Sequence, residues 1–255
     1  MSETYTRTET MPMIALRGLN MFPSMMLTFD VERESSLGAL EMAVKGNRNI
    51  FLAAQKDISV DIPEENDIYS VGVVCRVKQQ LRQPRSSVCR VMVEGLYRAR
   101  AEHMELSAKA YTAEVTELPD KAERVSEERL IALIRNCLSL YHDYLAENPE
   151  SITEQIINVL AVNEPGGVAN HIAHNVHFNL DDKQRLLEEL YPSKRLILLG
   201  KLLSREVNIL RIEKELSDAT QEQMNQNQRE YYLREEMKII QAELGEDGQT
   251  DDIGE

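Results

Sequence analysis

Residues 71–93, VGVVCRVKQQLRQPRSSVCRVMV, decide the fold of the first half of this chain. Apolar and polar side chains alternate over 71–81 and again over 88–93, which is the pattern of half-buried β-strands. The intervening Gln83-Pro84-Arg85-Ser86-Ser87 has the composition of a turn. These residues therefore predict a long antiparallel hairpin.

The residues before this hairpin predict further β-structure. Strands are expected at 13–16, at 25–31 and, fully buried, at 50–55. Between the last two, Ser35 or Ser36 is placed to cap a short helix that ends at Gly46. That helix would present Leu37, Leu40 and Val44 on one face. Strands at 97–101 and 108–118 would complete a β-rich lobe that ends at Pro119.

After Ser126 the apolar residues recur at helical spacing. An apolar stripe indicates a first helix, and further helices are expected at 152–160, at 168–177 and from a cap at Asp181 or Asp182 to Leu190. The stripe comprises Leu130, Leu133, Ile134, Cys137, Leu138 and Tyr141.

One long helix is predicted from an N-cap at Ser193 to Leu244, about 75 Å at 1.5 Å per residue. Residues 220–230 offer only Met224 as an apolar group, so packing within the chain cannot hold that part. Apolar residues then resume at heptad-like spacing and indicate self-association. They are Leu233, Met237, Ile240 and Leu244. Residues 246–255 are predicted to be a disordered acidic tail.

Composition limits the function further. A formal net charge of −14 makes nucleic acid an unlikely ligand, because phosphate binding needs a basic surface. The 3 cysteines are widely spaced without a CxxC pair, as in reduced cytosolic proteins. No apolar run approaches the length of a membrane span, and the polar N-terminus lacks a signal sequence. The expected location is the cytoplasm.

Several segments resemble the N-terminal region of Lon-type ATP-dependent proteases, in order along the chain. They are PMIALRGLNMFPSMML at 12–27, FLAAQKD at 51–57, VGVVCRVKQ at 71–79, VMVEGLYRARAE at 91–102 and NQREYYLREEMKIIQAELGE at 227–246. The last is the most specific, because some 20 residues of such an unusual pattern do not arise by chance.

The resemblance implies an α+β fold: a PUA-like pseudobarrel lobe at 1–119, a small helical bundle at 120–192, and a long protruding C-terminal helix at 193–245. It also implies a substrate-recognition and assembly role. The expected partners are unfolded or degron-bearing proteins and the chain itself, as a dimer when isolated and a hexamer in the parent protease. The ATPase, with its ATP and Mg, and the Ser–Lys peptidase are expected further along, in modules absent from this chain.

No catalytic or cofactor motif is recognisable in the sequence itself. The only Gly-Lys pair, Gly200-Lys201, has Leu where a P-loop needs a hydroxyl residue, and it falls inside the predicted long helix. Ser193-Lys194 is better explained as a helix cap than as a catalytic dyad. His171, His174 and His177 cannot all face one metal ion from a regular helix. No catalytic residue, cofactor or metal site is therefore expected here.

Candidate substrate contacts lie in an apolar turn near the N-terminus. Flexible Met side chains in an exposed turn suit a binder of varied unfolded segments, although the alternative that these residues are ordinary core at a strand crossing stays open. The candidates are Leu19, Met21, Phe22, Pro23 and Met25, with Met224 on the long helix. An alternative function is a stand-alone Lon-domain-like scaffold or regulatory protein without a protease.

Overall fold

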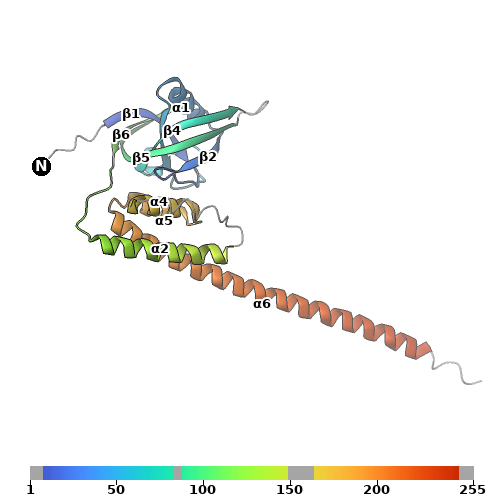
Figure 1. Cartoon of the computed structure of the whole chain (residues 1–255). Helices are drawn as coiled ribbons and strands as arrows, with labels where there is room; N and C mark the ends of the chain where they lie inside the picture. The colour runs from blue at the N-terminus through green and yellow to red at the C-terminus, as the bar shows by residue number, and fades with distance from the viewer. Residues whose placement is uncertain (1–7, 83–87, 149–163, 247–255) are drawn as a thin grey trace, which may run out of the picture. The chain divides into compact units, whose positions relative to one another are not determined.

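A computed structural model describes residues 8–82, 88–148 and 164–246, with side chains as far as Ala242. It divides into two compact units, Met1–Glu206 and Val207–Glu255. The first unit contains a sheet and several helices, so the predicted α+β class is confirmed (Figure 1). The domain boundaries expected near residues 119 and 192 stay predictions.

A six-stranded sheet forms the β-rich lobe, in the order β2-β5-β4-β3-β1-β6 with an additional β5–β6 pairing. Its strands are β1 (Thr8–Leu16), β2 (Met26–Val31), β3 (Asn49–Ala54), β4 (Val71–Arg82), β5 (Cys89–Leu106) and β6 (Tyr111–Glu117). The predicted hairpin is confirmed, because β4 and β5 pair antiparallel from Val71↔Arg100 to Arg82↔Cys89.

Strand β5 is a single 18-residue strand where two separate strands were expected. It stays continuous because irregularities in its pairing let it bend as it passes from one neighbour to the next. Its first half pairs with β2 at residues 89–94, and its second half pairs with β6 at residues 99–106.

The lobe is consequently closed at one end and open at the other. At the closed end, pairings run from β5 through β6, β1, β3 and β4 back to β5. At the other end β2 stands beside β5 in place of β6, and no pairing of β2 with β1 is recorded among the described residues. We call the gap between β2 and the second half of β1 the seam.

Helix α1 (Glu34–Lys45) packs mainly against β1. Ala39, Leu40 and Ala43 are its buried apolar residues, and Gly46 ends it as predicted. The predicted cap is wrong: Arg33 occupies the N-cap position, no side chain caps it, and Ser35 and Ser36 are buried in the first turn.

The helical part of the first unit consists, among the described residues, of α2 (Glu127–Glu147), α4 (Pro165–Asn175), α5 (Leu180–Glu188) and the beginning of α6 (Pro192–Glu246). They lie side by side below the sheet in Figure 1. Ser126 caps α2 by accepting from the Arg129 amide. For α5 the predicted Asp caps are wrong, because Asn179 accepts from the Asp182 amide. The predicted helix at 152–160 lies outside the described residues.

Two buried arginines and one carboxylate join the lobe to these helices. Asp120 follows the lobe, and it accepts from Arg98 of β5 (2.7 Å) and from Arg195 of α6. Burial raises the pKa of Asp120, but the two arginines outweigh burial and lower it overall. Burial, and then repulsion from Arg195, lowers the pKa of Arg98 to about 10. The contact thus ties three separate segments together.

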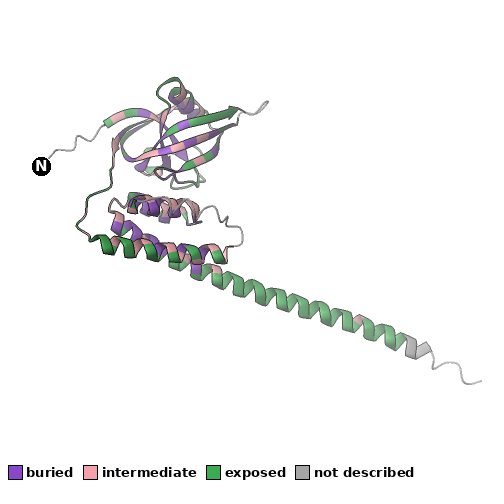
Figure 2. Cartoon of the chain, in the orientation of Figure 1, coloured by how far each residue is buried: buried purple, intermediate pink, exposed green. Residues whose placement is uncertain are grey.

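Helix α6 begins at Pro192, so the predicted N-cap at Ser193 is wrong: Ser193 lies inside the helix and donates to Glu123. The helix is continuous across the boundary between the two units. In the first unit it buries Leu196, Leu199 and Leu203. Beyond Val207 almost every described residue is exposed (Figure 2). None of the helices in the described part of the chain is both long and apolar enough to cross a membrane.

Candidate functional site

The apolar turn between β1 and β2 is largely core. Met21 is 2% exposed, Phe22 0% and Met25 8%. The turn lies against β5, where Ser24 N donates to the Gly95 carbonyl (2.9 Å) and Gly95 N donates to the Met25 carbonyl (2.8 Å). This backbone pairing turns the three side chains inward, so the exposed patch predicted for them is wrong.

Two of the predicted contact residues are exposed. Leu19, just before the buried turn, is 40% exposed. Met224 is 54% exposed on α6, in the second unit. Pro23 is half-buried. Of the predicted contacts in the lobe, Leu19 is therefore the one that offers an open apolar side chain to a ligand.

Leu19 stands at a hollow that occupies the seam, with a volume of about 280 Å³. We call it the seam hollow. One wall is the end of β1 and the residues after it, and the other is β2 with the first turn of α1. The lining residues are Ile14, Ala15, Leu16, Arg17, Leu19, Thr28, Phe29, Asp30, Val31, Glu32, Arg33 and Ser36.

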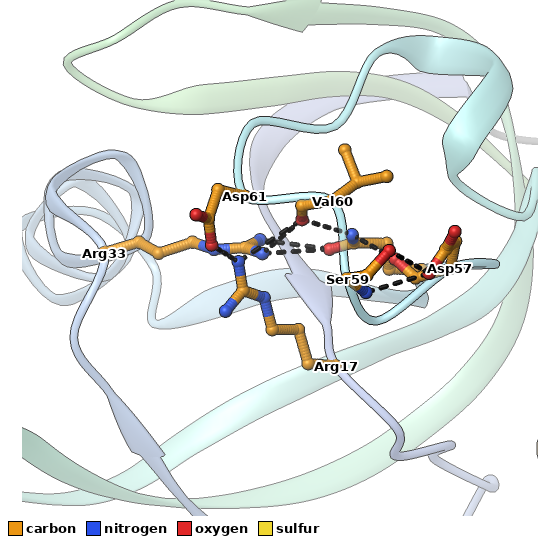
Figure 3. Close-up of polar contacts among 7 residues, drawn as sticks. Arg17, Arg33, Asp57, Ser59, Val60 and Asp61 are labelled. Carbon is orange, nitrogen blue, oxygen red and sulfur yellow. Dashed lines mark hydrogen bonds and ion pairs between the residues drawn. The ribbon is translucent and has the colours of Figure 1, made fainter.

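A polar network fixes the loop beside this hollow (Figure 3). The Val60 carbonyl accepts from Arg17 Nη2 (3.2 Å), Arg33 Nη2 (3.1 Å) and Gln55 Nε2 (2.7 Å). Arg33 also donates twice to Gln55 Oε1, and Arg17 pairs with Asp61. The loop after β3 is therefore held to both arginines rather than left to move freely.

The network also sets the charge balance at the hollow. Burial, and then repulsion from Arg17, lowers the pKa of Arg33, and the hydrogen bond from Arg17 lowers the pKa of Asp61. Asp57 accepts from the amide and hydroxyl of Ser59, and both bonds lower the pKa of the Asp57 carboxyl. The carboxylates here are thus held in their charged form.

A second hollow, of about 620 Å³, adjoins the first at Arg33. We call it the acidic hollow. Met104 and Tyr111 form a buried apolar floor, whereas Glu34, Glu64 and Glu65 are exposed at its rim. The full lining is Arg33, Glu34, Ser35, Asp61, Ile62, Pro63, Glu64, Glu65, Met104, Leu106, Ser107, Ala108 and Tyr111.

Two more exposed apolar side chains lie on the loop that the network fixes. Ile58 is 61% exposed and Ile62 is 81% exposed. Gly18, at φ 65°, lies beside Ile58: a Cβ built on it would be 3.8 Å from Ile58 Cγ2. Leu19 lines the seam hollow and Ile62 lines the acidic hollow, whereas Ile58 lies beside Gly18 and lines neither. We call these three exposed side chains the apolar rim, and their exposure suits contact with an apolar ligand segment.

Sequence reasoning missed most of this rim. It gave no role to Ile58, Ile62, Arg17 or Arg33. The available signal was the pair of isoleucines within an otherwise acidic and polar stretch, QKDISVDIPEEND at 55–67. Two apolar side chains this close together in a polar loop are candidates for core or for contact with a ligand, and the structure places both outside the core.

The three histidines of α4 and its C-terminal end make ordinary structural contacts. Burial, and then the charges of Lys183 and His171, lower the pKa of His174 to about 4, although a hydrogen bond to the Met26 backbone opposes this. His177 Nδ1 lies 3.2 Å from the Tyr144 hydroxyl. Within the described ranges, no group of three His, Cys, Asp or Glu side chains is arranged to hold a metal ion.

On α6, the predicted self-association residues are open to solvent. Leu233 is 52%, Met237 60% and Ile240 49% exposed. The side chain of Leu244 lies outside the described residues. Exposed Ile209, Ile212 and Leu216 are further apolar residues on this part of the helix, and sequence reasoning had not selected them. The structure leaves self-association a prediction.

This architecture, a pseudobarrel followed by helices, is shared with solved N-terminal domains of Lon proteases. The N-terminal domain of a Mycobacterium avium complex Lon protease superposes with a TM-score of 0.62 at 20% identity, covering 77% of this chain and 98% of that one. A Lon N-terminal domain protein from Xanthomonas campestris gives 0.53 at 14% identity, covering 75% and 96%. These likenesses establish the fold.

The chain belongs to the family of ATP-dependent protease La (LON) substrate-binding domains, whose family model matches residues 10–205. It is 38% identical over 251 residues to a Lon protease of Clostridioides difficile, covering 97% of this chain and 32% of that protein. Lon protease 1 of Bacillus subtilis is 35% identical over 245 residues, covering 96% and 31%. The chain thus spans about a third of the length of these curated relatives.

Proposed function

We propose that this chain captures unfolded or degron-bearing protein segments for a Lon-type ATP-dependent protease, and that it does so at the apolar rim of the lobe. The observation that carries the proposal is the exposure of Leu19 at the seam hollow, of Ile62 at the acidic hollow, and of Ile58 on the same loop as Ile62. Membership of a substrate-binding family favours this function over the alternative of a stand-alone scaffold.

In this proposal the chain binds and positions substrate but does not cleave it. Its sequence contains neither a P-loop nor a recognisable nucleophile motif. ATP hydrolysis, with Mg, and peptide cleavage by a Ser–Lys dyad would belong to other modules of a cytoplasmic parent protease. The exposed face of α6 at Leu233, Met237 and Ile240 would support assembly of the hexameric parent.

The rim suits weak binding of many sequences. Burying an apolar side chain stabilises a complex by about 1.5–3 kcal/mol when exposure is fully lost, and the three rim side chains are only partly exposed to begin with. Because the polar network holds the loop in place, little conformational entropy is lost when it contacts a ligand. Contacts of this kind depend on apolar surface and not on a particular sequence.

The test measures binding of a fluorescently labelled, chemically denatured protein to the full chain. The triple change Leu19→Ser, Ile58→Ser and Ile62→Ser should weaken binding by about a hundredfold, because each change removes roughly 1 kcal/mol of apolar contact. Circular dichroism should remain unchanged, since these side chains are not core.

A matched control replaces two exposed apolar residues outside the rim, Met42→Ser on α1 and Leu81→Ser on β4. This variant should bind as the unchanged chain does. Equal binding by the triple variant, or an equal loss in the control, would contradict the assignment of the rim as the substrate-binding surface.

A further inference from the structure

Among the described residues, strand β2 pairs with a strand along one edge only. Its recorded pairing is with β5, from Met26↔Glu94 to Val31↔Cys89, and it stands at the end of the strand order. No other backbone partner of β2 is recorded among the described residues. An edge of this kind presents unpaired N–H and C=O groups that can pair with another extended chain.

The register indicates which residues present those groups. Gly95 N donates to the Met25 carbonyl, so Met25 and every second residue after it direct their backbone N–H and C=O groups to β5. The backbone of Met26 is instead hydrogen-bonded to His174 of α4. Because this direction alternates along a strand, Thr28 and Asp30 direct their amides and carbonyls to the free edge.

The free edge borders the seam hollow. Thr28 and Asp30 line the hollow together with the apolar Phe29 and Val31, and Leu16 lines it from the β1 side. An extended segment beside β2 would therefore have backbone partners along the strand and apolar walls for its side chains. His174 covers the edge at Met26, so the accessible part runs from Thr28 towards Arg33.

Beyond Arg33 the same path enters the acidic hollow. Carboxylates outnumber cations in the lining of this hollow. Arg33 donates to Gln55 and to the Val60 carbonyl, and Asp61 is paired with Arg17. Glu34, Glu64 and Glu65 are exposed. A lysine or arginine side chain complements this charge, and a carboxylate there would be repelled.

We propose that an unfolded polypeptide binds as an added strand along the free edge of β2, with apolar side chains in the seam hollow and a lysine or arginine in the acidic hollow. This proposal rests on the proposed function and specifies how substrate binds. Main-chain pairing gives affinity for any extended segment, and the two hollows select apolar stretches next to a basic residue.

The probe is a short fluorescent peptide of alternating leucine and serine with a lysine at each end, titrated into the full chain. Two further peptides carry backbone N-methyl groups, one on every leucine and the other on every serine. Amides of alternate residues face opposite edges of a strand, so one N-methylated peptide should lose binding by about tenfold or more and the other should bind nearly as the parent does.

Charge is tested separately. Replacing the terminal lysines with glutamates should weaken binding several-fold, and the change Glu34→Gln with Glu65→Gln should remove most of that difference. The control Glu213→Gln with Glu215→Gln, on exposed positions of the second unit, should preserve it. The lysine preference should also shrink at high salt, because exposed charges are screened.

Amide exchange gives an independent measurement, in which the bound parent peptide should slow the amides of Thr28 and Asp30. Equal binding by both N-methylated peptides, or unchanged exchange at these two amides, would overturn strand addition. The proposed function would survive that result if denatured protein still required the apolar rim. Binding of denatured protein without any binding of the parent peptide would also overturn strand addition.

Discussion

The two units of this chain bury their apolar residues to very different extents. In Met1–Glu206 the lobe and helices bury side chains from every described strand and α-helix, and Asp120 joins them through Arg98 and Arg195. In Val207–Glu255 the described side chains after Val207 are almost all exposed. Helix propensity alone stabilises an isolated helix weakly, so we predict that the second unit is stably helical only when it packs against another chain.

The largest effect is expected from the turn whose residues were candidate substrate contacts. Phe22→Ala should lower the free energy of unfolding of the first unit by about 3–5 kcal/mol, because it empties a fully buried site against β5. Urea melts followed by circular dichroism measure this. Loss of substrate binding without loss of stability would mean that Phe22 acts as a surface contact.

A smaller loss should follow from Asp120→Asn, which leaves Arg98 and Arg195 without their shared carboxylate. Arg98 Nε and Nη2 are already buried without a hydrogen-bond partner among the described residues. Removing one partner of a buried ion pair costs about 3–5 kcal/mol, and the 38% exposure of the Asp120 side chain reduces the expected loss to about 3 kcal/mol.

The control for Asp120 is Asp61→Asn, which breaks an exposed pair with Arg17 and should cost about 0–1 kcal/mol. Urea melts of the two variants give the comparison. Equal stability losses would show that Asp120 does not specially join the lobe to the helices.

Acid should weaken the first unit through His174. Burial holds the pKa of His174 near 4 in the folded chain, below its ordinary 6.5, so the unfolded chain binds the proton more tightly. Stability should therefore fall as pH drops from about 6.5 towards 4, by about 2 kcal/mol for this group.

Urea melts at about pH 7, 5.5 and 4.5 span this window and test the contribution of His174. His174→Gln should flatten the pH dependence, and His142→Gln, at an exposed position on α2, should leave it unchanged. An unaltered slope in the His174 variant would assign acid sensitivity to other groups.

The smallest effect on stability is expected from the apolar residues of the second unit. Leu233→Asp with Ile240→Asp should reduce self-association in light scattering and leave the melt of the first unit unchanged, because both side chains are exposed. Asp substitutions at exposed Asn225 and Gln228 provide the matched control for added charge. Unchanged association would remove these residues from the assembly surface.

The sequence predicted the strands and most helices because alternation and helical spacing report directly on which face of an element is buried. The hairpin at β4 and β5 and the long α6 are examples. The caps of α1 and α5 were misassigned because several polar residues precede each helix, and only backbone geometry distinguishes Arg33 and Asn179 from their neighbours.

The site was harder to predict because it depends on contacts distant in sequence. The burial of Met21, Phe22 and Met25 follows from pairing with Gly95, some 70 residues away in the chain, which no local pattern encodes. The seam hollow likewise exists because β5 exchanges β2 for β6 midway along its length. Leu19 was selected correctly as an exposed residue, but Ile58 and Ile62 were not.

Amide hydrogen exchange along α6, in chains diluted until monomeric, tests the contrast between the two units most directly. Amides near Leu196, Leu199 and Leu203 should exchange slowly, because their side chains are buried in the first unit, and exchange should become fast after Val207. Raising the concentration should restore protection around Leu233 and Ile240. Uniformly slow exchange to the end of α6 in the monomer would contradict the claim that the second unit needs another chain.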